Sequence, residues 1–250
     1  MKKLCLLLLV LTAYHYSRAQ DDDSNKPSSE ESEEYHSYRL EITEPPYGLD
    51  KVSALIAKIK RTEGDNGDDG TEALDQKTYL SLSLREKFTY NMIHPESYSQ
   101  NCDAMPAVQD EQKKIFGQLP DAFGEYSWSE HQSKFFLANK DSVMAWMRSI
   151  ISKDNRVGLN FKQVMVDINA KEMIPFLINM YNAEKKDHDI LTVLMLLMKD
   201  NEYDEFLVSL SYKKLYADKE SSYKAYLNFN TANEELIIKR ATNFYNELHK

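Results

Sequence analysis

The sequence predicts an all-α protein: an antiparallel helical array or α-solenoid-like bundle that follows a disordered acidic N-terminal leader. Three observations predict this fold class. From residue 73 onward glycine is scarce, and residues that favour helices, such as leucine, methionine, lysine and glutamate, are frequent. Apolar residues recur there at helical spacing, in segments separated by short turns. Residues 169–199 form two such segments, and the second is apolar nearly all round, so we expect other helices to pack around it.

Residues 1–20 have the layout of a secretory signal peptide. Two lysines precede an apolar run, and a more polar stretch ends in Ser17-Arg18-Ala19-Gln20, where we expect cleavage. The sequence contains no Asn-x-Ser/Thr acceptor for N-glycosylation, which fits a bacterial source. We therefore expect an exported protein, periplasmic or secreted, from a bacterium.

The charge of the mature chain narrows the class of partner. Removal of residues 1–20 takes away three basic residues and no acid, so the net charge changes from −9 to −12. This charge argues against nucleic acid, whose phosphates need a basic face. The apolar run Ile190–Met198 is too short to cross a bilayer, so we expect no transmembrane span after signal cleavage. The oligomeric state is left open.

The mature chain divides into an acidic leader and one domain. Residues 21–37 are rich in Asp, Glu and Ser and poor in apolar residues, which predicts disorder. Residues 38–250 are predicted to form a single all-α domain. Residues 38–43 alternate as a short strand does, or form an extended arm against the helices.

Residues 62–72 are predicted to be a flexible, acidic, glycine-rich loop. With Asp65 as first ligand, Asp69 and Gly70 would fit a calcium-binding loop. Gly67 would then stand at the third position and Gln76 at the twelfth, where carboxylates are needed. A plain linker is the simpler interpretation, and calcium binding is left open.

The predicted helices follow in order. Ser83 and Glu86 form a capping box before a helix that Pro95 ends, and Thr231 with Glu234 suggests another before the last helix. Asp187 or Asp189 could cap the second helix of residues 169–199. The expected helices cover residues 49–60, 84–94, 108–119, 128–138, 141–157, 159–168, 170–184, 189–199, 203–216 and 231–248.

One stretch resembles a known repeat family. Residues 170–178, with Pro175 inside an apolar helix, resemble the first helix of a HEAT repeat, and Asp187-His188-Asp189-Ile190-Leu191 resembles the acidic turn that opens its second helix. The resemblance covers about residues 169–199, lacks the usual arginine in the second helix, and has no second copy. HEAT arrays are typically protein-binding scaffolds, so the resemblance implies a scaffold.

Polar residues concentrate in the Arg85–Asp103 stretch. His94 ends a helix there, where the helix dipole favours a histidine whether or not it has a function. His94 could instead act as base to a Cys102 nucleophile, with Asn101 or Glu96 as orienting group. Cys102 is the one cysteine left after residues 1–20 are removed, so it is either buried and inert or reactive.

A second candidate lies in residues 120–131, where Phe123, Tyr126 and Trp128 interleave with acidic residues. Aromatic and acidic side chains together suit sugars or cationic groups. The same aromatics could simply anchor a helix connection onto the core.

No zinc, phosphate-loop, dinucleotide or serine-hydrolase motif occurs, so we predict no metal site, no cofactor and no catalytic residue. The predicted function is a non-catalytic exported scaffold that binds a protein or peptide, which makes a binding protein more expected than an enzyme. The alternative is a hydrolase with its site in the Arg85–Cys102 loop. The candidate binding residues are Arg85, His94, Glu96, Tyr98, Cys102, Glu125, Trp128 and His131.

Overall fold

The computed structural model describes residues 28–64, 69–100, 108–217 and 224–250. Helices account for most of them, so the mainly helical prediction is confirmed. The helices are α1 (Glu30–Leu40), α2 (Leu49–Ile56), α3 (Gln76–Ser81), α4 (Leu84–Ile93), α5 (Glu130–Ala138), α6 (Lys140–Asp154), α7 (Leu159–Asp167), α8 (Ile174–Glu184), α9 (His188–Asp200), α10 (Asp204–Leu207), α11 (Leu210–Tyr216) and α12 (Thr231–Glu247).

In the described part of the chain two small sheets accompany these helices, and the all-α prediction did not include them. One has the strand order β1-β2-β3-β5 and the other pairs β4 with β6, with every pair antiparallel. The strands are β1 (Thr62–Glu63), β2 (Asp69–Thr71), β3 (Ser97–Ser99), β4 (Lys114–Phe116), β5 (Tyr126–Ser127) and β6 (Tyr226–Asn228).

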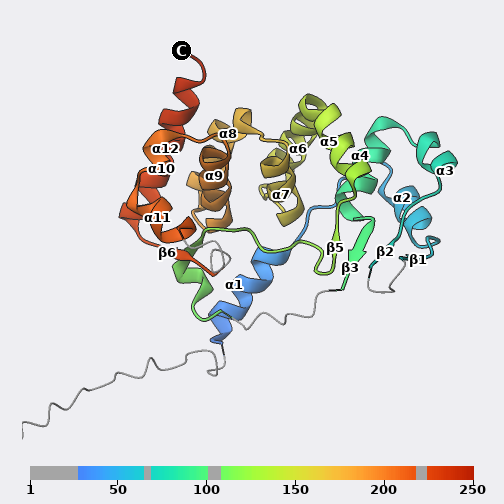
Figure 1. Cartoon of the computed structure of the whole chain (residues 1–250), viewed down its shortest axis with the longest axis horizontal. Helices are drawn as coiled ribbons and strands as arrows, with labels where there is room; N and C mark the ends of the chain where they lie inside the picture. The colour runs from blue at the N-terminus through green and yellow to red at the C-terminus, as the bar shows by residue number, and fades with distance from the viewer. Residues whose placement is uncertain (1–27, 65–68, 101–107, 218–223) are drawn as a thin grey trace, which may run out of the picture.

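The helices lie in a row across the molecule, and α9 is central to one half of it. Figure 1 shows α12 and α9 at one side, α7 and α6 in the middle, and α4 and α2 at the other side, with α1 beneath the row. Helix α9 contacts α7, α8, α10, α12 and β4. All residues from His188 to Met198 are buried, so the predicted burial of this helix is confirmed.

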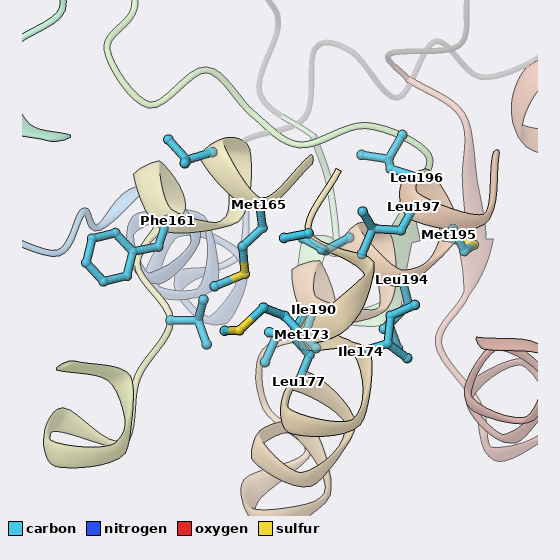
Figure 2. Packing of buried hydrophobic residues seen from close by; sticks show 14 of the residues in the cluster. Phe161, Met165, Met173, Ile174, Leu177, Ile190, Leu194, Met195, Leu196 and Leu197 are labelled. Carbon is cyan, nitrogen blue, oxygen red and sulfur yellow. The ribbon is translucent and has the colours of Figure 1, made fainter. Parts of the chain in front are cut away.

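Apolar side chains from α7, α8 and α9 form the middle of the core. Figure 2 shows Met165 of α7 and Met173, just before α8, pointing toward each other between the helices. Leu177 of α8 and Leu194 of α9 lie in the same cluster, and all four are fully buried. Methionine suits such a junction because its flexible side chain fills irregular gaps.

Helix α9 also covers the open edge of β4. The hydroxyl of Thr192 donates to the carbonyl oxygen of Phe116 (2.8 Å). The Nδ1 atom of His188 forms a hydrogen bond with the carbonyl oxygen of Lys114 (3.1 Å). The helix predicted for residues 108–119 is therefore wrong: a short 3-10 turn at Glu111–Lys113 leads into β4. Pairing with β6 and cover from α9 outweigh a helical propensity that is only a weak preference.

A cluster of buried charges joins three helices at the start of α9. The Arg39 guanidinium of α1 contacts both oxygens of Asp189 (2.9–3.1 Å) and reaches Glu111 (2.8 Å). Lys162 of α7 pairs with Asp187 at 2.7 Å. All five residues are buried. The two predicted capping carboxylates therefore bind cations, and neither caps α9 through its side chain.

The predicted disordered leader, residues 21–37, needs correction. Residues 21–27 lie outside the described part of the chain, but Glu30–Leu40 is a helix that begins at a Ser29 N-cap, with glutamates in its first turn. One face of α1 is buried, through Ser32, Tyr35 and Arg39. The prediction of disorder rested on the low content of apolar residues. The buried face of α1 is held mainly by polar contacts, and hydrophobicity does not measure these.

The strand or extended arm predicted for residues 38–43 is only partly right. Residues 38–40 belong to α1, and residues 41–46 form an extended arm against the start of α7. The backbone N–H of Thr43 donates to the side-chain oxygen of Asn160, whose amide N–H donates to the Thr43 carbonyl (both 2.9 Å). A Cβ on Gly158 would stand 2.3 Å from the backbone nitrogen of Thr43, so this contact requires glycine.

The predicted loop at residues 62–72 is partly a hairpin. Strands β1 and β2 pair through Thr62 with Thr71 and Glu63 with Gly70, and β3 extends the sheet. Residues 65–68 lie outside the described part of the chain. Such two- and three-residue strands are too short for an alternating pattern to reveal them in the sequence.

Two further sequence features are settled by the helix ends. The capping box of Ser83 and Glu86 is present at α4, but α12 is capped by Asn230 rather than by the predicted Thr231. Pro175 occupies the first turn of α8 instead of its interior, a position where proline suits a helix. No helix in the described residues combines the length and apolarity needed to cross a membrane.

The charge cluster gives a stability prediction. Arg39→Met leaves Asp189 and Glu111 buried without their main cation, so we expect a loss of about 3–5 kcal/mol of unfolding free energy. Lys134→Met, which breaks the exposed pair with Glu130, should cost less than about 0.5 kcal/mol. Denaturant titration of both variants measures the difference, and equal losses would contradict the assigned role of Arg39.

A second prediction concerns pH. Burial lowers the pKa of His188 to about 4. Between pH 4 and its unfolded pKa near 6.5, the imidazole is therefore protonated in the unfolded chain but neutral in the folded one. This contribution to stability is complete above about pH 6.5 and falls by up to about 3 kcal/mol as the pH drops through 4. His188→Asn should flatten this part of the stability profile, whereas His249→Gln at the exposed C-terminus should not. A His188→Asn profile that matches the unmodified chain would refute the effect.

Candidate functional site

Part of the predicted polar site is a buried hydrogen-bond network around Glu96, between the end of α4 and the start of α5. We call it the Glu96 network. The Glu96 carboxylate accepts hydrogen bonds from the hydroxyls of Tyr90 (2.9 Å) and Ser129 (2.6 Å). The His131 ring, half exposed, lies 3.5 Å from the same carboxylate. Each oxygen of Glu96 is thus occupied by a neighbouring side chain, and the arrangement holds the two helices together.

Gln132 of α5 completes the Glu96 network. Its side-chain oxygen accepts from the backbone N–H of Glu96 (3.0 Å), and its amide donates to the His94 carbonyl (2.7 Å). Gln132 also forms the α5 capping box with Ser129. The ring of His94 pairs with the carbonyl oxygen of Glu72 at 2.7 Å. His94 therefore ends α4 as predicted, and its Nε2 binds the neighbouring strand region.

Of the remaining predicted site residues, Tyr98 and Glu125 come close together, because the backbone N–H of Ser99 donates to the Glu125 carbonyl (3.0 Å) beside the β3–β5 pair. Arg85 is exposed and its guanidinium lies 5.0 Å over the Tyr47 ring. Tyr98 is in β3, with the Arg61 guanidinium 3.6 Å from its ring. Glu125 is exposed at the turn before β5. Cys102 lies outside the described residues, so its pairing with His94, and the hydrolase that needs it, stay predictions.

Trp128 belongs to a different feature, a pocket of about 250 Å³ beside α7. The segment 118–128 forms one wall, α7 forms another, and Leu196 of α9 contributes to the lining. Residues 120–131 were the second candidate from the sequence, and the pocket gathers their three aromatic rings. Its lining includes Asp121, Phe123, Tyr126, Trp128, Gln163 and Asp167.

Local contacts hold the pocket wall in place. The Gln163 side chain of α7 donates to the Pro120 carbonyl (2.8 Å), which pins the segment to the helix. Gly124 adopts a left-handed conformation (φ 63°) in the turn between Phe123 and Tyr126. The indole N–H of Trp128 donates to the Asn91 carbonyl (2.6 Å), and its ring meets Phe123 edge to face at 5.6 Å.

The electrostatics of the pocket are one-sided. Two aspartates line it, and none of its described lining residues is a lysine, arginine or histidine. Desolvation, and next the charge of Asp200, raise the pKa of Asp167 to about 6. Asp167 nevertheless keeps more than a third of its surface exposed, so water screens its charge. An anionic carboxylate beside aromatic rings is a site for a cationic or hydroxyl-rich group.

Sequence reasoning missed the residues that complete each feature. Tyr90 lies in the predicted polar stretch, but Ser129 and Gln132, which complete the Glu96 network, were missed. The capping pattern Ser129-x-x-Gln132 was a signal that could have located both. Asp167 and Gln163 come from α7, well beyond Trp128 in the chain. No local pattern links them to the aromatic segment, since only the packing of that segment on α7 brings them together.

Comparison of the chain with protein-family models, with curated proteins and with solved structures gives no match.

The Glu96 network gives a further stability prediction. Glu96→Gln replaces one acceptor oxygen by an NH₂ group that faces the hydroxyl donors, so we expect a loss of about 1–3 kcal/mol of unfolding free energy. Glu44→Gln makes the same chemical change at an exposed position and should be nearly neutral. Denaturant unfolding tests both variants, and an unchanged stability for Glu96→Gln would contradict a structural role for the Glu96 network.

Proposed function

We propose that this chain is an exported, non-catalytic helical scaffold that binds another protein or a peptide through the pocket lined by Phe123, Trp128 and Asp167. The pocket is the observation that carries the proposal. It offers aromatic rings and Asp121 on a segment that is fixed to α7, and Asp167 on α7 itself. Neither carboxylate forms an ion pair with another described residue. Aromatic side chains in such positions commonly anchor protein interfaces, because they contribute a large contact area at small entropic cost.

The surrounding architecture supports a binding role. The wall of the pocket is tied to two helices, through Gln163 to α7 and through Trp128 to the last turn of α4. A site held on rigid elements loses little conformational entropy when a partner binds. We further propose that the helices stack as an antiparallel array related to HEAT scaffolds, and that residues 1–20 direct export. The N-terminal sequence pattern and the helix pair at residues 169–199 support these two points.

Selection from a random peptide library displayed on phage tests the proposal. Peptides selected on the full chain should bind Phe123→Ala about tenfold or more weakly, because an aromatic anchor of the pocket is lost. Leu210→Ala removes a large apolar side chain that is 83% exposed on α11 and should leave binding unchanged. Failure to select any binder, or selected peptides that lose affinity equally for both variants, would overturn the pocket as the binding site.

A further inference from the structure

Asp167 differs from the carboxylates at the start of α9 in having no partner among the described residues. The buried carboxylates at the start of α9, Asp187 and Asp189, are each bound by a cation of the same chain. The carboxylate of Asp167 lines the pocket with no hydrogen bond or ion pair to another described residue. Its neighbour Asp200 adds negative potential that Lys199 partly offsets through a 3.0 Å ion pair.

The other residues of the pocket suit a cationic group as the counter-ion of Asp167. Phe123 and Trp128 line it together, and aromatic faces attract ammonium and guanidinium groups through the ring quadrupole. Asp121 adds a second carboxylate from the wall formed by residues 118–128. A phosphate or carboxylate ligand would meet two aspartates and no cation among the described lining residues, so an anionic ligand is disfavoured.

We propose that the pocket receives the side chain of a lysine or arginine on the partner polypeptide, with Asp167 as counter-ion and Phe123 and Trp128 against its aliphatic stem and charged head. This inference rests on the proposed function and names the chemistry that the scaffold recognises. A basic residue both satisfies the unpaired carboxylate and covers the rings. The acidic net charge of the chain, −9, would favour the approach of a basic segment.

The pocket carries its own reporter. The chain has two tryptophans, Trp128 in the pocket and Trp146, which packs against Phe88 and Tyr47 in the core. In a Trp146→Phe background, tryptophan fluorescence therefore reports on the pocket alone. The probes are acetylated, amidated tripeptides with lysine, arginine or norleucine between two alanines. Norleucine keeps the aliphatic stem of lysine and removes the ammonium group.

The lysine or arginine tripeptide should change Trp128 fluorescence saturably and bind about tenfold or more tightly than the norleucine tripeptide. Asp167→Asn should abolish this preference for the cationic probe. Asp154→Asn, at an exposed position at the end of α6, should keep it. Asp167 is the last residue of α7 and its carboxylate makes no hydrogen bond to another described residue, so we expect its asparagine variant to fold.

The outcomes separate this inference from the proposed function. If norleucine binds as well as lysine, or if Asp167→Asn keeps the preference, the cation assignment is wrong while phage-selected peptides that depend on Phe123 still support the scaffold. If a neutral sugar such as maltose saturates the signal and both basic probes fail, the pocket is a carbohydrate site and the cation assignment is overturned. If the charged probes bind but no selected peptide does, the proposed peptide-binding function fails and the pocket recognises small amines.

Discussion

The structure depends on how the first turn of α9 is neutralised. This helix is buried along nearly its whole length, yet its start carries Asp187 and Asp189. Unpaired carboxylates in such an environment would be very costly, so cations must come with them. Arg39 arrives from α1 and Lys162 from α7, and each fixes its helix against α9. The ion pairs thus determine the position of two helices that the apolar core alone would hold less specifically.

The same helix α7 connects this structural cluster to the candidate site. Near the start of α7, Lys162 pairs with Asp187, and the last residue of the helix is Asp167, which lines the pocket. Because Lys162 fixes α7 against α9, it also sets where Gln163 and Asp167 stand. The pocket therefore needs no rearrangement to form, since its aromatic wall is hydrogen-bonded to α7 and to the last turn of α4. A preformed acidic and aromatic pocket is the feature that most favours a binding role.

The polar stretch after Arg85 shows how concentrated functional groups can serve stability. Glu96, Ser129 and Gln132 satisfy one another across the α4–α5 junction, where the chain must turn at Pro95. Buried polar groups require such partners, so a polar loop that packs into the protein acquires a network of this kind. The aromatic segment after Pro120 differs because its rings face a cavity, and its neighbouring acid at Asp167 has no partner among the described residues.

The sequence by itself determined the helical class, the central burial of α9 and the capped start of α4. These follow from apolar periodicity and capping patterns, which act over a few residues. Only the tertiary structure decided that Glu30–Leu40 is a helix, that Lys114–Phe116 is a strand, and that Asp167 lines the same pocket as Trp128. Arg39 finds Asp189 across 150 residues, and β4 pairs with a strand more than a hundred residues away. Such contacts depend on charge and backbone complementarity between distant segments, and local sequence patterns do not encode which segments will meet.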